Sequence, residues 1–294
     1  MKTAIAIYKL KLESPCEIFV HRINKIFHGK IKANEIKYFK NPKKLRKKHF
    51  KNGLWNFKGI ILPDYKPDEV GWSINHVYKD TLFVYCMHKD NYDSSFIDKL
   101  DEFLPEGTYC YRNIDIDVTV KENDIVIDAG AWIGDFSAYA SIKGAKVYAF
   151  EPSKDNFKYL SKTQELNKNI HIIRKGLGDK PGVSYITNIT GNAASNHITT
   201  DIAGSEKIEM TTIDLFVSEH QLLRVDFIKA DIEGYERYML IGAKETLRKF
   251  GPKLAICTYH TSDDPEILKQ IILNANPKYI IVQKRKKLYA MLKQ

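Results

Sequence analysis

Cysteine is scarce in this chain of 294 residues, which has only Cys16, Cys86, Cys110 and Cys257. No two of them form a C-x-x-C pair, so their spacing predicts neither a disulfide framework nor a zinc site. Long apolar runs are missing too, because no stretch approaches the roughly 18 residues that a membrane-spanning helix needs. The opening stretch, MKTAIAIYKLKLESP, holds too short an apolar run for a secretion signal. We therefore expect a cytoplasmic protein with reduced thiols, with peripheral contact to a membrane left open.

Acidic residues are rare near both ends of the chain. Residues 28–58 carry 11 Lys and Arg residues against 1 acidic residue, and residues 278–294 carry 6 against none. Residues 59–277, in contrast, carry 24 basic and 33 acidic residues. An acidic body with basic ends predicts an anionic partner, such as a phosphorylated glycan, an anionic lipid surface or RNA. A solvated lysine-rich face without a partner would give the same pattern.

The first part of the chain, residues 1–105, predicts a mixed α+β region that precedes the main domain. Its most basic segment has the cap, the first-turn proline and the terminating glycine of a helix over residues 42–52. Only Leu45 and Phe50 offer this helix apolar anchors, so most of its surface faces water or an anion. Lys47 is therefore a candidate for binding an anionic acceptor.

After residue 123 the pattern alternates between strands and helices, which is typical of an open, mostly parallel sheet. The last two strands are joined by a short turn and should pair antiparallel. Residues 106–294 are thus predicted to form one α/β domain. Strands are expected at 124–129, 146–150, 170–175, 225–230, 253–259, 279–283 and 287–292, and helices near 134–142, 154–166, 235–249 and 264–274.

The turn after the first of these strands is a candidate ligand-binding loop, with Gly130 and Gly134 allowing close approach of a ligand. Asp128 stands where the dinucleotide fingerprint has its first glycine, and a carboxylate there suits a cationic amino group rather than a pyrophosphate. Glu151 directly follows the next strand and is placed to accept hydrogen bonds from two ribose hydroxyls. S-adenosylmethionine has both groups. A helix-capping Asp128 and a solvent-facing Glu151 are the structural alternatives.

Further blocks follow in a specific order: 124–136, then Phe150-Glu151-Pro152, 176–179, 211–214 and, above all, 228–236. Together they resemble the FkbM-type methyltransferases over roughly residues 106–277. The resemblance implies a class I, Rossmann-like α/β fold whose seven-stranded sheet has an antiparallel last strand. It also implies S-adenosylmethionine as cofactor and O-methylation of sugar hydroxyls in glycans, glycolipids or glycosylated metabolites. By this resemblance the cofactor site is formed by Asp128, Gly130, Ala131, Gly134, Glu151, Pro152, Leu177, Gly178 and Asp179.

Methyl transfer to a hydroxyl requires an aligned acceptor oxygen and a group that removes its proton. The carboxyl ends of the fourth and fifth strands of the domain should bring Asp231, Glu233 and His260 together for this task. Either the trio binds a divalent cation such as Mg²⁺, which lowers the pKa of the acceptor hydroxyl, or one member acts as general base. A helix-capping Glu233 and a strand-end His260 are the alternatives. Lys229 should stay charged beside these acids.

The segment 187–205 is rich in Asn, Ser, Thr and Gly, which is typical of an acceptor-binding loop over an active site or of a mobile surface loop. Within it, Asn192, Ser195 and His197 are candidates for hydrogen bonds to sugar hydroxyls. Two other functions stay open: a non-catalytic protein that binds the cofactor or an anionic surface, and RNA methylation. The latter is favoured by the net charge of +10 and by aromatic residues around the basic stretch. These aromatic residues are Phe39, Phe50, Trp55 and Phe57.

Overall fold

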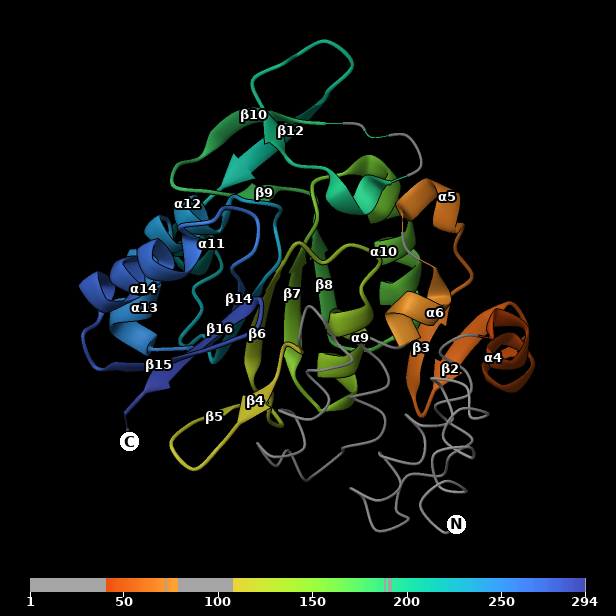
Figure 1. Cartoon of the computed structure of the whole chain (residues 1–294), viewed down its shortest axis with the longest axis horizontal. Helices are drawn as coiled ribbons and strands as arrows, with labels where there is room; N and C mark the ends of the chain where they lie inside the picture. The colour runs from red at the N-terminus through yellow and green to blue at the C-terminus, as the bar shows by residue number, and fades with distance from the viewer. Residues whose placement is uncertain (1–40, 72, 79–107, 188, 190–191, 294) are drawn as a thin grey trace, which may run out of the picture.

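The computed structural model describes residues 41–71, 73–78, 108–187, 189 and 192–293. Its central sheet contains β6 (Ile125–Ala129), β7 (Lys146–Phe150), β8 (Ile170–Ile173), β13 (Phe227–Ala230), β14 (Lys253–Cys257), β15 (Tyr279–Lys284) and β16 (Lys287–Leu292). The seven strands lie in the order β15-β16-β14-β13-β6-β7-β8 (Figure 1). From β14 to β8 neighbouring strands are parallel, whereas β16 is antiparallel to both β14 and β15. The predicted class I methyltransferase sheet and its antiparallel end are confirmed.

Helices cover both faces of this sheet (Figure 1). One face carries α9 (Asp135–Ile142) and α10 (Lys154–Leu166), and the other carries α11 (Ile213–Glu219), α12 (Glu236–Ile241), α13 (Lys244–Phe250) and α14 (Asp264–Ala275). Alternate side chains of β6 divide between the two cores, since Val126 belongs to the cluster that contains α9 and α10 and Ile127 to the other cluster. Both residues are completely buried. The sheet therefore has apolar packing on both faces, as parallel sheets require.

The single helix expected over 235–249 is two helices, α12 and α13, so the prediction that it is continuous was wrong. Gly242 lies at the break, and its carbonyl accepts a hydrogen bond from the Asp214 backbone N–H at 2.9 Å. A Cβ at position 242 would also overlap the carbonyl of Gly178. The chain therefore turns where it approaches two neighbouring loops closely.

The described part of the N-terminal region packs on α9 and α10. It consists of α4 (Pro42–His49), β1 (Phe50–Lys51), β2 (Leu54–Phe57), β3 (Ile60–Pro63), α5 (Pro67–Val70) and α6 (Ile74–Val77). Phe57 and Leu62 are completely buried in the same apolar cluster as Phe136 of α9 and Tyr159 of α10. Residues 41–78 thus share a core with the sheet. The boundary predicted between residues 105 and 106 lies outside the described residues.

The basic helix forms as α4, but it ends at His49 rather than at residue 52, because Phe50 pairs with Trp55 in the β1–β2 hairpin. The predicted anchors are confirmed, since Leu45 is completely buried and Phe50 packs against the core. The Arg46 guanidinium covers the Phe50 ring at 3.6 Å. Trp55 is 3% exposed and Phe57 0%, so these two aromatic residues are not available to stack on nucleic-acid bases.

A second, smaller sheet lies over the carboxyl ends of β6 and β7 (Figure 1). It has the order β11-β10-β12-β9 and consists of β9 (Gly176–Leu177), β10 (Gly182–Ile186), β11 (Ile198–Thr199) and β12 (Glu206–Thr211). The loop expected over 187–205 therefore contains β11 and the short 3₁₀ helix η2 (Ala193–Ser195). At the opposite end of the central sheet, β4 (Tyr111–Arg112) and β5 (Asp117–Val118) form a small hairpin. Every helix within the described ranges is too short or too polar to cross a bilayer.

Candidate active site

A cavity lies at the carboxyl ends of β6, β7 and β13, beneath the small sheet. This edge of an open parallel sheet is where small-molecule sites occur. The predicted residues that line it are Gly130, Glu151, Pro152, Leu177, His197, Asp231 and Glu233. The others lie outside its lining: Lys47, Asp128, Ala131, Gly134, Gly178, Asp179, Asn192, Ser195 and His260.

Glu151 follows β7 and is 6% exposed, so it does not face bulk solvent. Its Oε2 accepts the backbone N–H of Trp132 at 2.9 Å, and its Oε1 accepts that of Ser153 at 2.9 Å. The Asn156 amide donates to Oε1 from 3.4 Å. Burial raises the pKa of Glu151 to about 7, although these donors oppose the shift. A ligand that donates further hydrogen bonds would favour the ionised carboxylate.

Asp128 has a different role from the one predicted. It is completely buried, and the Lys229 ammonium lies 3.0 Å from its Oδ1, while the Ser137 hydroxyl donates to its Oδ2 at 2.6 Å. The parallel register places Asp128 of β6 directly beside Lys229 of β13. Lys229 also donates to the carbonyl of Gly130 at 2.5 Å, so it fixes the turn. The amino group beside Asp128 therefore belongs to the protein rather than to a ligand.

The glycines of the turn serve close packing within the protein. A Cβ on Gly130 would overlap the carbonyl oxygen of Asp231, so glycine lets the turns after β6 and β13 touch. A Cβ on Gly134 would lie 2.8 Å from Leu160 and 2.9 Å from Thr163 of α10. Gly130 lines the cavity as expected, whereas Gly134 allows α9 to begin against α10.

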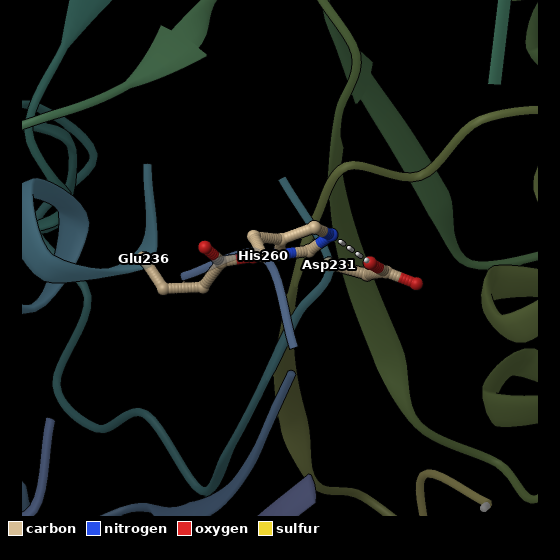
Figure 2. Close-up of side chains that lie close together, drawn as sticks. All are labelled: Asp231, Glu236 and His260. Carbon is tan, nitrogen blue, oxygen red and sulfur yellow. Dashed lines mark ion pairs between the residues drawn. The ribbon is translucent and has the colours of Figure 1, made fainter. Parts of the chain in front are cut away.

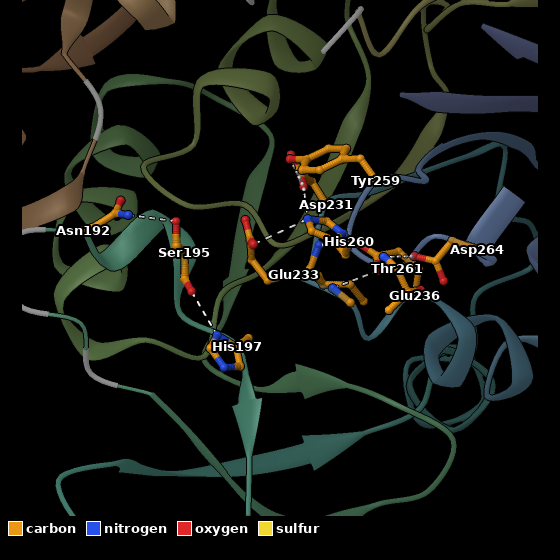
Figure 3. Close-up of polar contacts among 12 residues, drawn as sticks. Asn192, Ser195, His197, Asp231, Glu233, Glu236, Tyr259, His260, Thr261 and Asp264 are labelled. Carbon is orange, nitrogen blue, oxygen red and sulfur yellow. Dashed lines mark hydrogen bonds and ion pairs between the residues drawn. The ribbon is translucent and has the colours of Figure 1, made fainter. Parts of the chain in front are cut away.

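Asp231 follows β13, lines the cavity and has a side chain that is 19% exposed. The hydroxyl of Tyr109 donates to its Oδ2. The hydroxyl of Tyr259 donates to its Oδ1 at 3.2 Å, as Figure 3 shows. Burial alone would raise its pKa. The pKa is instead lowered to about 2, because the positive charges of Lys287, Lys229 and His260 surround the carboxylate. Asp231 is thus ionised at any physiological pH.

His260 lies behind Asp231 with a carboxylate at each ring nitrogen. Its Nδ1 is 3.0 Å from Glu236 Oε1, and its Nε2 is 3.5 Å from Glu233 Oε2 and 3.7 Å from Asp231 Oδ1 (Figures 2 and 3). Burial lowers the pKa of the imidazole, but these carboxylates raise it to about 10. His260 is therefore an imidazolium at neutral pH. In this state it has no lone pair with which to take a proton or bind a cation.

The groups with metal-ligand chemistry differ from the predicted trio. Ligand atoms of Asp231, Glu236 and His260 lie within 4.8 Å of one another (Figure 2), with Glu236 in place of Glu233. Glu236 is already engaged, because its carboxylate accepts the backbone N–H groups of Ile232 at 2.9 Å and Gly234 at 3.0 Å. His260 and the carboxylates around it therefore form an internal ion-pair network, and the divalent cation stays a prediction.

Two of the predicted acceptor-binding residues bind each other. Asn192 Nδ2 donates to Ser195 Oγ at 2.9 Å, and neither residue lines the cavity (Figure 3). His197 is exposed at the rim, with its Nδ1 3.2 Å from the Ser195 carbonyl. Lys47 is exposed on α4, which packs on β1, β2 and α6 rather than at the cavity. Of these candidates, His197 alone is positioned to meet a ligand in the cavity directly.

Several side chains of this site were missed from the sequence. Lys287 is 1% exposed although it is charged, and its ammonium lies 4.4 Å from the centre of the Tyr109 ring beside Asp231. Nothing in the local sequence distinguishes it from the lysines next to it. Glu236, in contrast, belongs to the block over 228–236 and could have been found there. The missed residues are Tyr109, Trp132, Asn156, Glu236, Tyr259 and Lys287.

A family model described as a methyltransferase FkbM domain matches residues 128–279. The hexuronic acid methyltransferase AglP of Haloferax volcanii is 27% identical over 157 residues, which cover 53% of this chain and 64% of that protein. The methyltransferase sdnD of Sordaria araneosa is 28% identical, with 48% of this chain and 70% of that protein covered. Among solved structures, the methyltransferase FkbM from Methylobacillus flagellatus KT has a TM-score of 0.45 at 17% identity, covering 88% of this chain and 59% of that one. The chain thus spans less than two thirds of the Haloferax and Methylobacillus proteins.

Proposed function

Because the chain belongs to the FkbM methyltransferase family, we propose that it is an S-adenosylmethionine-dependent O-methyltransferase acting on a sugar hydroxyl in a glycan, glycolipid or glycosylated metabolite. One observation carries this proposal: the same cavity is lined by Glu151, suited to two ribose hydroxyls, and by the ionised Asp231, suited to an acceptor hydroxyl. The name of the Haloferax relative, a hexuronic acid methyltransferase, supports a sugar acceptor.

The residues of the cavity fit the proposed cofactor. Among the residues that the structure describes, the buried Oδ1 of Asn156 has no hydrogen-bond partner. Asn156 lines the cavity beside Glu151, so the pocket offers an unused acceptor to a donor on the ligand. Glu151 would hold the ribose, with the turn at Gly130 and the apolar side chain of Leu177 as further contacts. When bound, S-adenosylmethionine supplies a methyl group already activated by its positive sulfur.

Asp231 would receive the proton of the acceptor hydroxyl. A carboxylate with a pKa of about 2 is too weak a base to deprotonate a free alcohol. The hydroxyl would become strongly acidic, however, as a methyl group passes from sulfur to its oxygen, so Asp231 could take its proton late in the step. The hydroxyls of Tyr109 and Tyr259 hold the carboxylate in place. Glu233, which also lines the cavity, would accept a hydrogen bond from a neighbouring sugar hydroxyl.

The exposed lysines of α4 would meet an anionic group outside the cavity, as in a phosphorylated or lipid-linked acceptor or at an anionic membrane surface. We exclude Arg46 from this set of lysines, because its guanidinium forms an ion pair with Asp64 at 3.1 Å and covers the Phe50 ring. We define the α4 lysine surface as Lys43, Lys44, Lys47 and Lys48.

Transfer of a radiolabelled methyl group from S-adenosylmethionine into a glycan-containing cell extract tests the proposal. The products are separated into lipid-linked glycan, soluble glycan, RNA and protein, with and without EDTA. We expect label in a glycan fraction, and we expect it to persist in EDTA because His260 and Glu236 already pair with each other at 3.0 Å. Loss of the label with EDTA would instead support the predicted divalent cation. Nuclease-sensitive label would overturn the sugar acceptor in favour of RNA, and cofactor binding without any label would indicate a non-catalytic binding protein.

A further inference from the structure

Trp132 connects the cofactor pocket to the N-terminal region. Its backbone has φ +51°, a left-handed conformation that is unfavourable for a bulky residue, and in this conformation its N–H donates to Glu151. Its indole N–H donates to the carbonyl of Val70, the last residue of α5, at 3.1 Å. The ring of Tyr65 meets the indole edge-on, with 5.9 Å between ring centres. A strained backbone conformation of this kind persists only where neighbouring residues hold it. Here Tyr65 and Val70 of the N-terminal region are among those neighbours.

The other side of Glu151 leads to the small 3₁₀ helix over the cavity. The Asn156 amide donates both to Glu151 Oε1 and, at 3.0 Å, to the carbonyl of Ala193. Next to Ala193, Asn192 lies against Gly71, where a Cβ would overlap the Asn192 side chain and lie 3.1 Å from its Cα. Gly71 directly follows Val70. The contacts therefore form a closed ring from α5 through Trp132, Glu151, Asn156 and the 3₁₀ helix back to α5.

The segment that closes this ring is itself firmly attached to the sheet domain. Glu69 of α5 accepts the hydroxyl of Tyr159 at 2.6 Å, and the ammonium of Lys158 lies 3.2 Å from the same carboxylate oxygen. Both partners belong to α10, which lies beside α5 in Figure 1. Because α5 is fixed in this way, Val70 and Gly71 can act as fixed points for the residues around the cavity.

We propose that Val70 and Gly71 are positioning residues of the cofactor site, which hold Trp132 and Asn192–Ala193 so that Glu151 presents its carboxylate in a geometry ready for the ribose. The proposal rests on the proposed function, since it concerns the same cofactor. It assigns to the N-terminal region a direct part in cofactor affinity, beyond its packing on α9 and α10.

The first test removes the indole N–H of Trp132 by the substitution Trp132→Phe. Cofactor binding by this variant is compared with that of Trp55→Phe. Trp55 is a matched control, because its indole N–H also donates a hydrogen bond, at 3.2 Å to Asp64, away from the cavity. Binding of S-adenosylmethionine is measured by calorimetry, which needs no acceptor. We expect Trp132→Phe to raise Kd by roughly threefold to tenfold, the effect of one lost hydrogen bond, and Trp55→Phe to leave it unchanged.

The second test is Gly71→Ala with Gly59→Ala as its control. Both glycines have a positive φ, +97° and +103°, so both substitutions strain the backbone, but a Cβ at position 59 would have no atom of the described residues within 4 Å. Only Gly71→Ala should displace Asn192 and weaken cofactor binding. Thermal unfolding of all four variants identifies any that fail to fold.

A pH profile distinguishes positioning from mere packing. The backbone N–H of Trp132 stabilises the ionised form of Glu151, and the positive charge of Lys229 also lowers the pKa of this carboxyl group. Without the indole hydrogen bond to Val70, the backbone N–H of residue 132 should shift away from Glu151. The midpoint pH of cofactor binding should then move upward in Trp132→Phe and not in Trp55→Phe. The proposal is overturned if Trp132→Phe binds the cofactor as tightly as Trp55→Phe does, or if Gly71→Ala binds it as tightly as Gly59→Ala does. If the wild-type protein does not bind S-adenosylmethionine at all, the proposed function itself fails.

Discussion

At the scale of single residues, Asp231 and Glu151 show how one cavity can hold two carboxylates in opposite states. Both are removed from water, which favours the neutral acid. Asp231 has the charges of Lys229 and Lys287 close by, and its pKa is lowered to about 2. Glu151 has mainly uncharged N–H donors, and its pKa is raised to about 7. The difference in neighbours suits Asp231 to a permanent charge and Glu151 to a charge that its ligand stabilises.

Replacing Asp231 by Asn should abolish most turnover while cofactor binding stays within about twofold. Asparagine keeps the shape and one oxygen, but it cannot take the proton of the acceptor, and such a group contributes about 10²- to 10⁴-fold to the rate. Initial rates and calorimetry on the same preparation measure both effects. Asp115→Asn, at an exposed position in the β4–β5 turn, is the control that should change neither. Normal turnover of Asp231→Asn would exclude this residue as the proton acceptor.

Cofactor affinity should depend on the ionisation of Glu151. The neutral acid accepts hydrogen bonds from two ribose hydroxyls more weakly than the carboxylate does, and its share grows as the pH falls through about 7. We therefore expect Kd for S-adenosylmethionine to be constant above pH 8 and to rise by up to about tenfold for each pH unit below 7.

Glu151→Gln provides the comparison for this pH dependence. It should bind the cofactor more weakly at pH 8 and show little change down to pH 6, because glutamine does not titrate. An equally steep pH profile in Glu151→Gln would place the titrating group elsewhere.

At the scale of elements, α4 presents the α4 lysine surface beside a hairpin that contributes to the core. We expect the protein to sediment with vesicles of anionic lipid at low salt, to lose this association as salt screens the charges, and to ignore neutral vesicles. Changing the four lysines of the surface to Gln should abolish sedimentation without affecting cofactor binding.

The control for the α4 variant removes the same charge from scattered exposed positions. Lysines at 168, 180, 207 and 244 are all exposed and lie on other parts of the molecule. If this control variant loses vesicle binding as completely as the α4 variant, the interaction depends on net charge alone and α4 is not a specific surface.

The elements themselves were largely predictable, because their signals are local. Periodic apolar residues and flanking turns were sufficient to predict the seven strands of the central sheet and α4, with its cap at Asn41, whose side chain accepts the Lys44 N–H at 3.0 Å. The break at Gly242 was not predictable, since it depends on contacts with Gly178 and Asp214 in other loops. Glu151 was placed correctly at the cavity because the end of a parallel strand fixes its position. Asp128 was predicted to bind the ligand, and its buried partner Lys229 could not be foreseen because the two residues lie about a hundred positions apart in the sequence.

At the scale of the whole molecule, the N-terminal region and the sheet domain share one apolar cluster. A division at residue 105 would remove Trp55, Phe57 and Leu62 from this cluster and would separate the ring of Tyr159 on α10 from that of Tyr65. Burying large apolar side chains such as these contributes about 1.5–3 kcal/mol each. Summed over these side chains, the contribution is comparable with the free energy of unfolding of an ordinary domain.

We therefore expect a fragment of residues 106–294 to lose the cooperative thermal transition of the full chain and to bind dyes that recognise exposed apolar surface. Calorimetry and dye fluorescence on the fragment and the full chain make the comparison. A fragment that unfolds cooperatively within a few degrees of the full chain would show that the two parts fold independently, as the predicted boundary suggests.

The strand order β15-β16-β14 has a consequence for synthesis of the protein. β15 leaves the ribosome before β16, yet within the described residues it pairs only with β16, so there it has no strand partner until residues 287–292 follow. Until then the edge of β14 offers unpaired backbone groups, the kind of edge on which chains aggregate. Lys287, the first residue of β16, reaches the surroundings of Asp231 at the same moment. Ribosomes that stall just before this strand would release chains with an open sheet edge and an incomplete active site, and we expect such chains to be cleared by quality control.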